Sequence, residues 1–129
     1  MTLRKLLPSV FLAIGLAATP AAAFMAKNGF TVRQLDGGRF EVLSRGGLGV
    51  SEAWCAAGDF VVRALGKPRN THIWRISEPP RRSGQSIVFS LSSEGAASST
   101  GLSSFGSGSS VSAAHAENIC TALSGMSDR

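Results

Sequence analysis

The chain has 129 residues, of which 43% are hydrophobic, and a formal net charge of +5 at pH 7. A chain of this length fits one small domain. So mild a charge excess also disfavours nucleic acid as a partner.

Residues 1–23 have the layout of a secretory signal peptide. Basic residues precede the apolar run LLPSVFLAIGLAA, and three alanines end the segment. The run is short for a membrane span and contains a proline, which disfavours the alternative of a retained anchor. We expect cleavage after Ala23, leaving residues 24–129 as one periplasmic or secreted domain without a transmembrane segment.

Export determines how the cysteines are interpreted. Cys55 and Cys120 are the only two, and both follow the expected cleavage site. Disulfides persist in oxidising compartments, so we predict a Cys55–Cys120 disulfide. Closing so long a loop would stabilise the fold by about 4 kcal/mol in the chain-entropy model.

Two segments near the start of the expected mature chain alternate between apolar and polar residues. Residues 30–35 (FTVRQL) and 39–44 (RFEVLS) flank Asp36-Gly37-Gly38. Turn residues of this kind tolerate positive φ, so the pattern predicts a β-hairpin.

Residues 51–65 (SEAWCAAGDFVVRAL) have the most regular amphipathic pattern and predict a helix. At 100° per residue, its apolar face includes Trp54, Cys55, Val61, Val62 and Leu65. The opposite face, which we expect to be exposed to solvent, holds Glu52, Ala56, Asp59 and Arg63.

Further signals mark the ends and the interior of this helix. Ser51 is the expected N-cap and Gly66 the expected stop. Asp59 and Arg63 form an i, i+4 pair of the stabilising orientation. Gly58 lies within the apolar face, which predicts a close-packed neighbour there, the helix of the second cysteine.

The second half of the chain repeats the order of elements. Residues 71–77 (THIWRIS) and 86–92 (SIVFSLS) predict a second hairpin with a proline-rich, basic loop at 78–84. Residues 93–110 are rich in Ser and Gly and predict a flexible loop, which Leu102 and Phe105 would attach to the surface. Residues 112–123 (SAAHAENICTAL) predict a helix that ends at Gly125.

These elements define the expected fold. The class is α+β, with the order ββαββα and a four-stranded, mainly antiparallel sheet. Both helices are expected on one face of the sheet, bridged by the disulfide.

The cysteines and histidines raise the alternative of a zinc site with the ligands Cys55, His72, His115 and Cys120. His115 and Cys120 are five residues apart, which places them roughly 140° from each other around a helix. This spacing disfavours a metal site, so we expect no metal, no cofactor and two partly exposed histidines.

The sequence favours a non-catalytic protein over an enzyme. The segment GLSSFG (residues 101–106) departs from the nucleophile elbow, because its second glycine comes one residue late. His72 has Glu78 or Asp59 as a conceivable orienting acid, but no spacing singles out either pair. A hydrolase with an unrecognised site therefore stays an alternative.

The segment GGLGVS (residues 46–51) precedes a helix, as phosphate-binding loops do. No Lys-Ser or Lys-Thr follows its glycines, so a hinge before the helix is the favoured interpretation. Binding of a carboxylate or phosphate of an envelope molecule stays open there.

The basic residues of one stretch are the candidate anion-binding residues: Arg63, Lys67, Arg69, Arg75, Arg81 and Arg82. Together with Trp74 they suit an anionic polymer, such as lipopolysaccharide or nucleic acid, or phospholipid head groups. The alternative interpretation is a solvated basic edge that discourages aggregation between strands. Trp54 and Trp74 are expected in the core.

These observations together predict a small, exported, disulfide-stapled protein of the cell envelope that acts by binding or as an accessory protein. The expected partner is an envelope protein or an anionic envelope polymer. The alternatives are an anionic-surface binder that uses residues 63–82 and the unrecognised enzyme.

Overall fold

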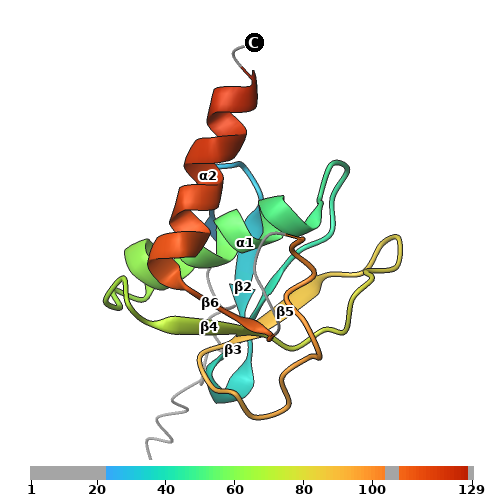
Figure 1. Ribbon diagram of the computed structural model, residues 1–129, viewed down its shortest axis with the longest axis vertical. Helices are drawn as coiled ribbons and strands as arrows, with labels where there is room; N and C mark the ends of the chain where they lie inside the picture. Colours follow the sequence, from blue (N-terminus) through green and yellow to red (C-terminus); the bar gives the residue numbers. More distant parts are fainter. Residues whose placement is uncertain (1–22, 104–107, 128–129) are drawn as a thin grey trace, which may run out of the picture.

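The computed structural model describes residues 23–103 and 108–127 (Figure 1). The expected signal segment up to residue 22 lies outside the described residues, as does Phe105. The elements in chain order are β1 (Phe24–Met25), β2 (Thr31–Gln34), η1 (Asp36–Gly38), β3 (Arg39–Val42), α1 (Val50–Asp59), η2 (Phe60–Ala64), β4 (His72–Arg75), β5 (Ile87–Ser90), β6 (Ser110–Ser112) and α2 (Ala113–Ser127).

The α+β class is confirmed, but the prediction of four strands is wrong. The sheet has six strands in the order β1-β2-β3-β5-β4-β6, and each neighbouring pair is antiparallel. The additional strands, β1 and β6, have two and three residues, too few for an alternating pattern. Their pairing partners define them, since Phe24 faces Val32 and Val111 faces Ile73.

Both predicted hairpins are present. The strands β2 and β3 pair with Val32 opposite Val42, and β4 and β5 pair with Trp74 opposite Ser90. The buried positions alternate along β3, where Phe40 and Val42 face the core. Burial on alternate positions is the reason that the sequence pattern located these strands.

The first predicted helix forms, but the face expected to be exposed to solvent is exposed only in part, at Glu52 and Arg63. Ala56 and Asp59 are buried. The helix α1 lies against the sheet on one side, where Trp54 meets Phe89, and against α2 on another, so little of it faces solvent. It also begins at Val50 with Gly49 as N-cap residue, which corrects Ser51, and continues as the π-helical η2.

The close neighbour expected at Gly58 is confirmed. A Cβ atom on Gly58 would lie 2.6 Å from the Cβ of Ala116 in α2. The two helices therefore approach each other to a distance that only a glycine allows. The predicted Cys55–Cys120 disulfide is also confirmed, with a Cα–Cα distance of 4.8 Å.

The helix α2 starts and ends later than predicted. Ser112 belongs to β6, and the helix continues through Gly125 to Ser127. Within the Ser/Gly-rich segment, Leu102 packs against the core and the Ala97 backbone N–H donates to the Arg75 carbonyl at 2.8 Å. The described part of this segment is therefore attached to β4.

Candidate functional site

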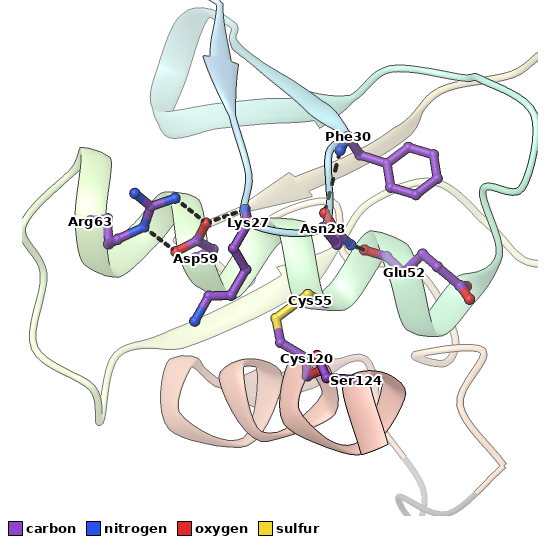
Figure 2. Close-up of a disulfide and its surroundings, with 9 residues drawn as sticks. All are labelled: Lys27, Asn28, Phe30, Glu52, Cys55, Asp59, Arg63, Cys120 and Ser124. Carbon is purple, nitrogen blue, oxygen red and sulfur yellow. Dashed lines mark hydrogen bonds and ion pairs between the residues drawn. A yellow bond between two sulfur atoms is a disulfide. The ribbon is translucent and has the colours of Figure 1, made fainter. Parts of the chain in front are cut away.

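A cleft opens beside the disulfide, between the two helices and the turn that joins β1 to β2 (Figure 2). Its volume is about 540 Å³. The residues that line it are Lys27, Asn28, Phe30, Glu52, Cys55, Cys120, Leu123 and Ser124.

The disulfide forms part of the cleft wall and fixes its width. Cys55 lies in the middle of α1 and Cys120 in α2, and both are buried. The bond joins the two helices directly at the cleft, so the helices cannot separate there while it is intact.

Asn28 attaches the turn to α1 across the top of the cleft. Its side-chain amide donates to the Glu52 carbonyl at 2.8 Å, and its Oδ1 accepts the backbone N–H of Phe30. Because both ends of the amide group are used, Asn28 holds the turn in one position. The Asn-Gly dipeptide at 28–29 favours a turn, but nothing in the sequence around it indicates the wall of a binding cleft.

Asp59 provides a second attachment of the turn to α1. Its carboxylate accepts the backbone N–H of Lys27 at 2.8 Å and the Nη2 of Arg63 at 2.6 Å. Burial acts to raise the pKa of Asp59, but the hydrogen bonds from Arg63 and Lys27 outweigh it, so the pKa lies below the ordinary value. The predicted i, i+4 pair is thus confirmed and holds a buried carboxylate.

The cleft combines apolar surface with two opposite charges. Phe30, Leu123 and the disulfide give the apolar part, while Lys27 and Glu52 lie on opposite sides of the disulfide (Figure 2). Neither charged group forms an ion pair with a described residue. The Ser124 hydroxyl donates to the Cys120 carbonyl within its own helix. This chemistry suits non-covalent binding of a molecule with both polar and apolar parts.

Three of the candidate anion-binding residues form contacts with other groups of the protein. Arg63 pairs with Asp59, and Arg69 lies 3.5 Å from a Glu117 carboxylate oxygen. Arg81 donates to the Leu48 carbonyl at 2.9 Å. The exposed members of the stretch are Arg63, Lys67, Arg69 and Arg82.

Arg75 is the exception, because its side chain is fully buried. It is 0% exposed, its Nε donates to the Ser77 carbonyl at 2.7 Å, and its Nη1 donates to the Thr100 carbonyl at 3.1 Å. Its Nη2 has no hydrogen-bond partner. Burial lowers the pKa of Arg75, and the charge of Glu78 opposes this only in part. Arg75 is therefore not part of a surface that a polymer contacts directly.

The other groups considered for chemistry are placed as follows. Cys55 and Cys120 are bonded to each other, so they do not ligate zinc. Within residues 23–103 and 108–127, no three His, Cys, Asp or Glu residues gather in a metal-binding arrangement. The His72 ring lies tilted against that of Trp74, with 5.6 Å between the ring centroids. The Glu78 carboxylate accepts the backbone N–H and the hydroxyl of Ser98, both at 2.7 Å.

Comparison with known proteins gave no relative: no protein-family model, no curated protein and no solved structure matches this chain. Among the described residues, no helix is both long enough and apolar enough to cross a membrane.

Proposed function

We propose that this protein is exported to the cell envelope and works there as a small, non-catalytic binding protein whose ligand occupies the cleft beside the disulfide. The observation that supports this proposal is the cleft itself, which the Cys55–Cys120 bond and Asn28 hold open. Its volume of about 540 Å³ lies in the range of sites for small ligands.

Preorganisation strengthens the case for binding. Each wall of the cleft is fixed by a bond that does not depend on a ligand: the disulfide between the helices and the Asn28 amide across the turn. Binding of a ligand then costs little conformational entropy in the site, which favours affinity. Lys27 and Glu52 would orient a ligand that carries both charges, such as a short peptide with free ends.

The envelope location follows from export. A disulfide is stable in oxidising compartments, which agrees with the sequence pattern of residues 1–23. The intact mass of the protein from its native compartment tests this part. We expect the mass of residues 24–129, rising by about two hydrogens on reduction. A full-length mass with free thiols would contradict export.

Binding in the cleft can be tested with anilinonaphthalene sulfonate, an apolar fluorescent anion that suits a cleft with Lys27 at its rim. We expect saturable binding to one site of the native protein. Ser124→Phe fills the cleft and should abolish this binding. Ala122→Phe is the matched control, because Ala122 is exposed on the same helix and does not line the cleft. Equal binding by both variants, or none by the native protein, would refute a ligand cleft here.

A further inference from the structure

A second, smaller pocket lies at the N-terminal end of α1, away from the disulfide cleft. Its volume is about 330 Å³. The residues that line it are Leu48, Gly49, Val50, Pro79, Pro80, Arg81 and Gly101. The pocket thus joins the glycine-rich segment before α1, the loop between β4 and β5, and the Ser/Gly-rich segment.

The first turn of α1 gives this pocket free backbone donors. The first hydrogen bond within the helix runs from the Ala53 N–H to the Gly49 carbonyl. The N–H groups of residues 50–52 therefore have no acceptor inside the helix, and Gly49 provides no side-chain cap. The positive end of the helix dipole lies at the same place.

Arg81 adds a positive charge that is held in position. Its Nη2 donates to the Leu48 carbonyl at 2.9 Å, and its Nη1 donates to the Gln85 carbonyl at 3.0 Å. All its hydrogen bonds to described residues go to neutral oxygens, so its charge is not neutralised.

The buried Arg75 guanidinium lies directly behind the pocket wall. A Cβ atom on Gly101 would lie 2.5 Å from Nη1 of Arg75 and 3.4 Å from the Val50 side chain. Gly101 and Val50 both line the pocket, whereas Arg75 does not line it and lies against Gly101. Arg75 donates hydrogen bonds to the carbonyls of Ser77 and Thr100. In sequence, these residues shortly precede Pro79 and Gly101, which line the pocket.

Arg75 carries a buried charge on which the charge of Glu78 acts, although the two groups form no direct ion pair. No carboxylate forms an ion pair with it, and its Nη2 is buried without any hydrogen bond. A buried charge of this kind is costly unless an opposite charge is brought near. Behind a low-dielectric wall, its field reaches the pocket with little screening.

Two carboxylates lie in this region. Glu78 is held by Ser98. The Glu52 carboxylate reaches back to Gly49, so it competes for the positive end of α1. Its side chain is partly exposed and makes no hydrogen bond to a described residue, so a ligand can displace it.

The geometry points to a binding site for a small oxyanion, a phosphate or carboxylate group, in the pocket between the N-terminus of α1, Arg81 and the wall in front of Arg75. The lining of this pocket shares no residue with that of the disulfide cleft. Glu52 connects the two, because it lines the cleft and its carboxylate lies near Gly49. The anion titrations and the Arg75 variant, which leave Glu52 unchanged, are therefore the tests that are independent of the function proposed for the cleft. The site brings together two features of the sequence, the segment at 46–51 and two of the candidate arginines, Arg75 and Arg81.

The test uses the expected mature protein and two probes, sodium phosphate and sodium acetate, each against sodium chloride at constant ionic strength. Backbone amide NMR shifts report where each anion binds. We expect saturable shifts at Gly49, Val50 and Gly101 for at least one probe, and the stronger probe identifies the chemistry. Absence of saturable shifts at these amides for both probes would overturn the proposal.

Substitution of Arg75 tests the buried charge. Arg75→Met is expected to weaken binding of the probe about tenfold, because it removes one charge near the site. Arg69→Met is the control, since it removes the same charge from an exposed residue outside the pocket. An equal effect of both substitutions would show that only overall charge matters, and would overturn the site.

Arg75→Met also removes the hydrogen bonds to Ser77 and Thr100, so this variant has a folding risk. If Arg75→Met does not fold, the variant Glu52→Gln tests whether the anion binds at this site. Removing the competing carboxylate should tighten probe binding about two- to fivefold if the anion binds at the N-terminus of α1. The N-terminal site predicts this gain whatever the role of Arg75, so unchanged or weaker binding would count against the proposal.

Discussion

Trp54 and Arg75 donate hydrogen bonds to the same backbone oxygen, that of Thr100. The indole Nε1 lies 3.0 Å from this oxygen and the guanidinium Nη1 lies 3.1 Å from it. Trp54 belongs to α1 and Arg75 to β4, so one carbonyl joins the helix, the sheet and the Ser/Gly-rich segment. This shared acceptor explains why a segment so rich in Ser and Gly has a defined path through Thr100.

The shared carbonyl leads to a prediction for Trp54→Phe. The substitution keeps an aromatic ring against Phe89 but removes the indole donor to Thr100. We expect the free energy of unfolding, measured in urea, to fall by about 1 to 2 kcal/mol. Trp74→Phe is the control, because the Trp74 indole makes no hydrogen bond to any described residue. A similar loss in both variants would contradict this role of Trp54.

The contact between the helices predicts opposite effects for two glycine substitutions. Gly58→Ala places a methyl group against Ala116 and should destabilise the protein by about 1 to 3 kcal/mol, despite the higher helix propensity of alanine. Gly125→Ala in α2 meets no atom within 4 Å and should stabilise by about 0.5 kcal/mol. Thermal unfolding measures the stability of both variants relative to the native protein. A Gly58→Ala variant that is more stable than the native protein would show that the helices can move apart.

The pKa of Asp59 predicts how the free energy of unfolding decreases at low pH. Its pKa in the folded protein lies below the ordinary value of 3.8, because the hydrogen bonds from Arg63 and Lys27 outweigh the effect of burial. Its contribution is therefore complete above the pKa of the unfolded state and is lost as the pH falls through the lower folded pKa. Asp59→Asn should cost about 1 to 2 kcal/mol at pH 7 and progressively less below pH 4.

Urea unfolding from pH 7 to pH 2 measures this difference. Asp36→Asn serves as the control, since Asp36 is exposed and makes no ion pair with a described residue. If the stability difference between native protein and Asp59→Asn is the same at pH 2 and pH 7, the carboxylate charge is not the cause.

Reduction of the disulfide should destabilise the fold and open the cleft. The bond closes a loop of 65 residues, which the chain-entropy model values at about 4 kcal/mol. We expect the double variant Cys55→Ala/Cys120→Ala to unfold at a lower urea concentration and to lose binding of the cleft probe. Retention of probe binding in a folded double variant would show that Asn28 alone holds the cleft.

The basic stretch predicts different results for two adjacent arginines. Arg81→Glu should lower the free energy of unfolding by about 1 to 3 kcal/mol, because it removes the hydrogen bonds that Arg81 donates to the Leu48 and Gln85 carbonyls. Arg82→Glu, at an exposed position, should leave stability unchanged. If the stretch binds an anionic polymer, Arg82→Glu elutes from heparin at lower salt than Arg45→Glu, which changes the charge equally elsewhere. Equal elution would remove the polymer hypothesis.

Local patterns in the sequence were sufficient for much of the fold. Alternation around Phe40 and Val42 identified β3, and the glycine in the apolar face of α1 predicted the approach of α2. The oxidising compartment implied by residues 1–23 led to the disulfide. Each of these inferences depends on neighbouring residues or on general chemistry, which a single sequence contains.

Tertiary contacts determined the features that the sequence did not reveal. The strand β6 forms because Val111 meets Ile73, although the residues around Val111 are serines and glycines. Arg75 gave the pattern of an exposed basic residue, yet the segment through Thr100 covers it. The cleft was missed because Lys27, Asn28 and Glu52 are ordinary surface residues in sequence, and only the fold brings them beside the cysteines.

The bridge between α1 and α2 also determines how the protein would respond to pulling at its ends. The strand β1 pairs through two residues at the edge of the sheet and would detach first, whereas α2 is covalently tied to α1 at Cys120. Under oxidising conditions the segment between the cysteines, which are 65 positions apart, cannot be extended, and this removes about 230 Å from the length that the chain could reach. Reduction would release that length, so the domain is a short tether when oxidised and a long one when reduced.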